Sequence, residues 1–192
     1  MKKFGILAIT LAVFAAILFL VLSPKEQREK QTTSMILTSP SFQNNELIPK
    51  KFTCDDGNIN PELHIQNVLE NAKSLALIMH DPDAPIPGGF THWVLWNIDP
   101  KTAIIKQESV PSGSVEGMNG RSLGYTGPCP PASPKLQRGE PTGTHRYFFM
   151  LYALDTTVSL PTSTTKSDLE SAMHGHIIAQ TELIGLYKKQ GN

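Results

Sequence analysis

A carboxylate, two imidazoles and a phenol stand where apolar segments of this chain begin or end. Asp81 lies two positions after the last residue of the apolar run 75–79, and His92 and His145 each lie at the start of a later apolar run. Tyr147 comes two positions after His145. A neighbouring carboxylate favours the protonated form of histidine, and imidazolium and phenol groups donate hydrogen bonds to anions. These residue types therefore suit a site for a small anion, and a polar network that only holds the loops together is the alternative.

Two further polar residues in the same segments are expected to be structural. Arg146 stands between His145 and Tyr147, so in a strand its side chain points to the opposite face. Asp83 lies in the turn after Asp81, among prolines that end a strand because they lack an N–H donor. We expect Asp83 to brace this turn and to pair with Arg146.

The elements that must position these residues are short β-type segments. Pro and Gly, 15 and 14 in number, lie mostly between them. This punctuation favours a mainly antiparallel β-sandwich or barrel. The predicted strands are residues 35–42, 47–54, 74–80, 91–98, 145–154 and 176–187. Since sites are built where strand ends meet loops, we expect the ends that carry Asp81, His92 and His145 to converge.

One helix is predicted near the C-terminus. Ser167 and Glu170 have the spacing of a capping box, an apolar pattern follows, and Gly175 would end the helix. The segment 156–167 before it is interpreted as a loop. A second long loop is expected over 132–144, which is rich in proline and glycine.

The first 23 residues predict a membrane-targeting helix. Lys2 and Lys3 precede an uncharged run from Phe4 to Leu22, which has about the roughly 20 residues that a membrane span needs. We interpret 1–23 as an uncleaved signal anchor or a cleaved signal peptide. Residues 24–33 would then be a linker, and 34–192 one exported domain.

Charge and cysteine content restrict the partners and the compartment. From residue 34 onward the chain has 12 Lys and Arg and 15 Asp and Glu, and this acidic balance argues against nucleic acid as a partner. Cys54 and Cys129 are the two cysteines of the chain. An even count in an exported protein permits a disulfide, and two separate buried cysteines are the alternative.

Catalytic motifs are missing from the sequence. Asp81, His92 and His145 nominally supply a two-histidine, one-carboxylate metal set, but there is no H-E-x-x-H motif. No G-x-S-x-G nucleophile elbow is present either. We therefore expect no enzyme activity, no catalytic residue, no bound metal and no cofactor, with a hydrolase or metal enzyme as the alternative.

The sequence resembles the phosphatidylethanolamine-binding protein family, in its bacterial branch of Raf-kinase-inhibitor-like proteins. The resemblance covers nearly all of the predicted exported domain. Its most specific motifs are DPDAP, GPCPP and HRY, which occur in this order. The matching segments are FTCDDGNINPEL (52–63), DPDAP (81–85), HWVLWNI (92–98), GYTGPCPP (124–131), HRYFFMLYALD (145–155) and AMHGHIIAQTELIGLY (172–187).

The resemblance implies a Greek-key β-sandwich with a helix near the C-terminus and one pocket for phosphate or a phosphorylated headgroup. The family's pocket positions fall on Asp81, His92, His145 and Tyr147. The stretch that contains Gly127, Cys129 and Pro131 would form part of the wall.

The resemblance also bears on location and partners. Together with the N-terminal segment, which predicts export, a bacterial protein of this kind is expected in the periplasm, anchored on the periplasmic side of the inner membrane or secreted. An alternative function is inhibition or regulation of an envelope protein through surface loops. The segment 132–144 is longer than expected for bacterial members. The oligomeric state stays open, with a homodimer among the options.

Overall fold

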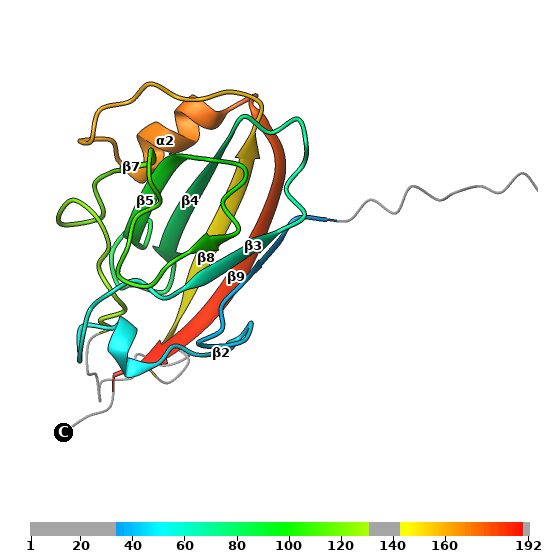
Figure 1. The fold of residues 1–192 in the computed structure, drawn as a ribbon. Coiled ribbons are helices and arrows are strands. Elements are labelled where there is room, and N and C mark those ends of the chain that lie inside the picture. The colour runs from blue at the N-terminus through cyan, green and yellow to red at the C-terminus, as the bar shows by residue number, and fades with distance from the viewer. Residues whose placement is uncertain (1–33, 131–142, 190–192) are drawn as a thin grey trace, which may run out of the picture. The chain divides into compact units, whose positions relative to one another are not determined.

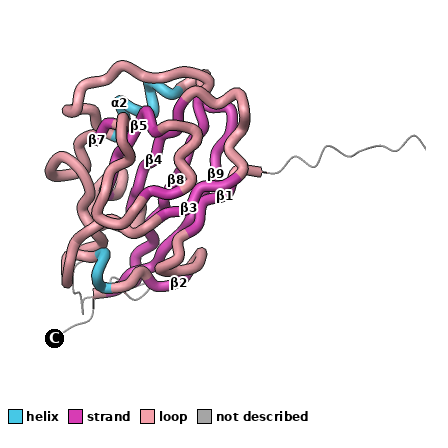
Figure 2. Tube along the Cα trace, in the orientation of Figure 1, coloured by secondary structure: helices cyan, strands magenta, loops and turns pink. Residues whose placement is uncertain are grey.

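The computed structural model describes residues 34–130 and 143–189, which form two β-sheets and two short helical segments (Figures 1 and 2). The smaller sheet has the strand order β1-β3-β6, and the larger has the order β2-β9-β8-β4-β5-β7. The strands are β1 (Ile36–Thr38), β2 (Glu46–Leu47), β3 (Leu63–Gln66), β4 (Ser74–Asp81), β5 (Phe90–Ile98), β6 (Ile104–Ile105), β7 (Val115–Glu116), β8 (Thr144–Leu154) and β9 (Ile177–Lys188). The helical segments are the 3₁₀ turn η1 (Lys50–Phe52) and the α-helix α2 (Lys166–Met173).

The large sheet places β4, β5 and β8, the strands that carry Asp81, His92 and His145, side by side. β4 pairs with β5 on one side and with β8 on the other, and both pairings are antiparallel. β8 thus returns to lie beside β4, in the order β8-β4-β5-β7, as in a Greek key. Because neighbours are antiparallel, the end of β4 lies beside the starts of β5 and β8.

The apolar core fills the space between the two sheets. Leu37, Leu63 and Ile105 of the small sheet belong to the same buried cluster as Leu77 and Leu151 of the large sheet. On the other face of the large sheet, a second cluster joins β4 and β5 to α2. Every residue of β4 except His80 is buried, which explains its continuous apolar run.

The mainly β fold with one helix near the C-terminus is confirmed. Four of the predicted strands correspond to β4, β5, β8 and β9 within one residue at each end. The prediction for 47–54 is wrong, because this segment keeps only the end of β2 and then forms η1. Of 35–42, only Ile36–Thr38 is a strand.

The helix begins two residues earlier than predicted. Thr165 is the N-cap: its side chain accepts a hydrogen bond from the Asp168 backbone N–H, and the Asp168 side chain accepts one from the Thr165 N–H. The expected capping box of Ser167 and Glu170 is therefore wrong. Gly175 follows the helix with a φ of +80°, a conformation that glycine adopts at low cost.

The predicted targeting helix (1–23) and linker (24–33) lie outside the described residues. Within residues 34–130 and 143–189, no helix is long and apolar enough to span a membrane.

Candidate functional site

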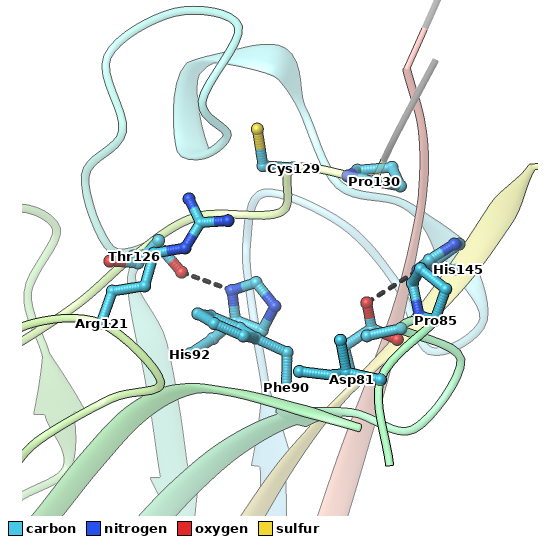
Figure 3. Close-up of a pocket in the computed structure, with 11 residues that line it drawn as sticks. Asp81, Pro85, Phe90, His92, Arg121, Thr126, Cys129, Pro130 and His145 are labelled. Carbon is cyan, nitrogen blue, oxygen red and sulfur yellow. Dashed lines mark hydrogen bonds and ion pairs between the residues drawn. The ribbon is translucent and has the colours of Figure 1, made fainter. Parts of the chain in front are cut away.

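Three adjacent strand ends bring Asp81, His92 and His145 to one cavity, as predicted from the sequence. The cavity has a volume of about 310 Å³. Figure 3 shows its walls, with Asp81 and His145 toward one side and His92 toward the other. It is lined by Asp81, Ala84, Pro85, Ile86, Phe90, His92, Arg121, Thr126, Cys129, Pro130 and His145.

Asp81 is held by the turn that follows it. Its Oδ1 accepts a hydrogen bond of 2.8 Å from the backbone N–H of Asp83, the local pattern of an Asx turn. Its Oδ2 lies 2.8 Å from Nδ1 of His145. Both oxygens of this carboxylate, which is only 3 % exposed, therefore have a partner in the protein.

Asp83 and Arg146 brace the rim of the cavity from outside. The guanidinium donates from Nε and from one terminal nitrogen to the two oxygens of Asp83, at 2.9 and 2.7 Å. The Arg146 backbone N–H donates to the same carboxylate. These bonds hold the pKa of Asp83 below its usual value. Neither side chain lines the cavity, in agreement with the structural role expected for both.

A β-bulge sets the direction of His92. In the register of β4 and β5, Met79 is paired with Trp93 and His80 with Thr91, so His92 is the extra residue on β5. Bulges re-aim side chains in this way beside functional sites. The His92 ring contacts the rings of Phe90 and Tyr147. The distances between ring centroids are 4.7 Å to Phe90 and 5.1 Å to Tyr147.

His92 carries a fixed hydrogen-bonding pattern. Its Nδ1 lies 2.6 Å from the carbonyl oxygen of Thr126, so Nδ1 bears the proton and donates it. Burial lowers the pKa of His92 to about 4, although the Thr126 carbonyl and the charge of Asp81 act in the opposite direction. The ring is neutral at pH 7, contrary to the expectation that a nearby carboxylate keeps it protonated.

The wall opposite the strand ends is tied to the 52–58 segment. Cys54 and Cys129 form a disulfide with Cα atoms 5.4 Å apart. The Gly127 N–H donates to Oδ1 of Asn58 at 2.8 Å. A Cβ on Gly127 would clash with the Phe52 carbonyl oxygen, so glycine is required there for this close approach. Of the predicted wall residues, Cys129 lines the cavity and Gly127 does not.

Tyr147 is fully buried and does not line the cavity. Its ring packs against those of His92 and His145, and its hydroxyl has no hydrogen-bond partner among the described residues. Burial and the Asp81 charge raise its pKa. In this conformation Tyr147 supports the two histidines, in place of the ligand contact expected from the sequence.

Two expectations lie wholly or mostly outside the described residues. Pro131, predicted as part of the wall, is one, and most of the loop 132–144 is the other. Within residues 34–130 and 143–189, no group of three or more His, Cys, Asp and Glu side chains is placed to hold a metal ion.

Arg121 is the main residue that the sequence analysis missed. It lines the cavity, and its guanidinium lies 5.5 Å from the centre of the Phe90 ring. The Arg121 backbone N–H donates to Oδ1 of Asn119, so a turn fixes its Cα. The only signal in the sequence was its position just before the GYTGPCPP segment, since no strand pattern covers it.

Comparison with known proteins identifies the family. The family model described as phosphatidylethanolamine-binding protein matches residues 38–188. The chain belongs to the phosphatidylethanolamine-binding protein family. A UPF0098 protein of Pyrococcus abyssi is 47 % identical over 164 residues, covering 81 % of this chain and 86 % of the relative. A UPF0098 protein of Chlamydia trachomatis is 39 % identical over 160 residues, covering 81 % of this chain and 99 % of the relative.

Solved structures of this family share the fold. A phosphatidylethanolamine-binding protein homologue from Chlamydia trachomatis superposes with a TM-score of 0.73 at 38 % identity, covering 82 % of this chain and 99 % of that one. E. coli YbcL, described as a new member of the mammalian phosphatidylethanolamine-binding protein family, also gives 0.73, at 26 % identity and the same two coverages. The resemblance seen in the sequence is therefore confirmed for the family and its β-rich fold.

Proposed function

We propose that this protein is a non-catalytic binding protein that takes a small anion or a phosphorylated headgroup into the cavity at the ends of β4, β5 and β8. The observation that carries the proposal is the convergence of His92, His145 and Arg121 on one cavity of about 310 Å³. A concave site with a few placed polar groups and apolar walls is the usual form of a small-molecule site. Membership of the family supports ligand binding in general.

The lining chemistry suits a ligand that is both charged and partly apolar. Arg121 offers several N–H donors that can bind phosphate oxygens in pairs. Ile86 and Phe90 supply apolar wall next to these polar groups. A headgroup fits this combination better than a bare polar anion, because its carbon chain would lie against the apolar side chains.

Titration of the purified full-length chain with phosphorylethanolamine and with inorganic phosphate tests the proposal. We expect saturable binding of at least one of them to the wild type, and loss of this binding in His92→Ala and in His145→Ala. His174→Ala is the matched control, because His174 is an exposed residue at the C-cap of α2 and does not line the cavity. Circular dichroism at the titration temperature checks that each variant is folded.

The outcome against the proposal is equally specific. If the two pocket variants bind as tightly as the wild type, then the ligand lies elsewhere. A steady release of inorganic phosphate from phosphorylethanolamine, lost in the same variants, would replace the binding function by a hydrolase.

Export to the periplasm, either anchored on the inner membrane or secreted, is part of the proposal. The Cys54–Cys129 disulfide supports it, since disulfides persist mainly in oxidising compartments. Cell fractionation followed by thiol labelling is the test. We expect an envelope protein whose two cysteines are blocked to labelling until a reductant is added, and N-terminal sequencing then distinguishes an anchor from a cleaved peptide. A fully labelled protein in the cytosolic fraction would contradict export.

A further inference from the structure

The fixed positive charge of the cavity comes from one side chain. Arg121 is the only Lys or Arg among the described residues that line it. Its guanidinium lies over Phe90, whose ring packs edge-on against His92. No ion pair joins Arg121 to a carboxylate within residues 34–130 and 143–189. Its donors are therefore available to an anion, next to His92.

His92 presents an acceptor to the cavity and no donor. Its Nδ1 proton is committed to the Thr126 carbonyl over 2.6 Å, which leaves Nε2 with a lone pair. Figure 3 shows this second ring nitrogen turned away from Thr126, toward the side where Asp81 and His145 lie. A ligand oxygen without a proton would meet the Nε2 lone pair and would be repelled.

Asp81 also disfavours an unprotonated ligand oxygen. Its carboxylate is 3 % exposed and lines the cavity, so a second negative charge placed close to it would be costly. A ligand group that carries a proton avoids both conflicts, because an O–H donates to Nε2 and reduces the ligand's charge. The cavity thus combines one cation at Arg121 with acceptors at His92 and Asp81.

We propose that Arg121 is the specificity-determining residue of this pocket, and that the pocket selects the singly protonated, monoanionic form of a phosphate monoester. Arg121 binds the unprotonated oxygens, and the remaining P–O–H donates its hydrogen bond to Nε2 of His92. This inference rests on the proposed anion-binding function. It adds the protonation state of the ligand and names Arg121 as the residue that binds the ligand's negative charge.

Several titratable or charged groups surround His92, and each contributes to the pH dependence of ligand affinity. They lie on β4, on β8 and on the loop that follows β7. The groups are Asp81, His80, His145, Tyr147 and Arg121.

Methyl phosphate is the probe that separates these contributions, because its dianion has no O–H left. Its second proton dissociates near pH 6, so we expect affinity for the full-length wild type to fall by about tenfold per pH unit above about pH 7. Inorganic phosphate retains one O–H as a dianion and should lose less affinity over the same range. Equal affinity for methyl phosphate at about pH 5 and about pH 8 overturns the inference.

Proton uptake identifies which group carries the shared proton. Calorimetric titration with methyl phosphate at about pH 5 in two buffers of different ionisation heat should show almost no uptake, since the monoanion already holds its proton. Uptake close to one proton would place the shared proton on a group of the protein and not on the ligand, and would overturn the inference.

Substitution of the arginine tests its role. Arg121→Gln should weaken methyl phosphate binding by at least about tenfold, the loss expected for a hydrogen bond to a charged group. Lys101→Gln makes the same charge change at an exposed position and should bind as the wild type does. If Arg121→Gln binds as tightly as the wild type, this inference fails while the proposed function stands. If the wild type binds neither of these phosphates but does bind phosphorylethanolamine, only this inference fails, and if it binds none of the three, both fail.

Discussion

His145 and Asp81 meet through a 2.8 Å contact between Nδ1 and Oδ2, although 64 positions separate them in the chain. Both side chains are almost completely buried. Removing one partner of a buried pair leaves an uncompensated charge, which costs several kcal/mol. We expect His145→Ala to lower the free energy of unfolding by about 3 kcal/mol, measured by urea denaturation at neutral pH.

The double variant is the control for this pair. In an Asp81→Asn background no buried carboxylate is left unpaired, so adding His145→Ala should cost no more than about 1 kcal/mol. An equal cost of His145→Ala in both backgrounds would mean that the pair contributes nothing specific.

The disulfide should stabilise both the fold and the cavity wall. It closes a loop whose ends are 75 positions apart, and the chain-entropy model gives about 4 kcal/mol for a loop of this length. We expect Cys54→Ser with Cys129→Ser to reduce the free energy of unfolding by about this amount. When the wild type is denatured by urea in the presence of dithiothreitol, its free energy of unfolding should fall by the same amount. The stability of the double variant should not change when the reductant is added. If complete reduction left the free energy of unfolding of the wild type unchanged, the disulfide would not stabilise the fold.

His92 should make the protein less stable in mild acid. Burial lowers the pKa of His92 from 6.5 to about 4 in the folded state, so between these values the unfolded chain binds a proton that the folded chain does not. The contribution is unfavourable in this window: stability falls as the pH decreases from about 6.5 to about 4, by about 3 kcal/mol. Above about pH 6.5 the ring is neutral in both states and the effect disappears.

The difference between the wild type and His92→Gln isolates this effect from the other acid-titrating groups. Urea denaturation across the window should show a smaller loss of stability in the variant. Parallel pH profiles for the two proteins would show that His92 titrates normally.

The N-cap of α2 can be located by two alanine substitutions. Thr165→Ala removes the side chain that accepts from the Asp168 N–H and should cost about 1 kcal/mol. Ser167→Ala, two positions later on an exposed part of the helix, should leave the melting temperature nearly unchanged. The reverse ranking would return the cap to the position predicted from the sequence. Ligand binding should be the same in both variants.

The sequence predicted those parts of the fold that long apolar patterns determine. β4, β5, β8 and β9 are long enough for their patterns to be clear. β6 and β7 have two residues each, so no periodicity can reveal them. The 3₁₀ turn at Lys50–Phe52 lies inside the segment that was predicted as a strand, and Pro49 at its N-cap is the local signal that the prediction passed over.

The site was predicted in part for a similar reason. Asp81, His92 and His145 could be placed because strand ends mark them. The direction of His92 could not, because it depends on a bulge that appears only in the register between two strands. Its neutral state depends on burial and on the Thr126 carbonyl, and Arg121 depends on a turn that no repeating pattern announces.

The pairing of β4 with β8 has a consequence for the order of events during synthesis. β4 ends at Asp81 and β8 begins at Thr144, so the ribosome must add the 64 further residues up to His145 before the carboxylate can meet its imidazole. Contacts between such distant segments form late and slow down folding. A nascent or truncated chain that stops before β8 could make the β4–β5 hairpin but not a working cavity. Ligand binding would therefore report completion of the whole large sheet.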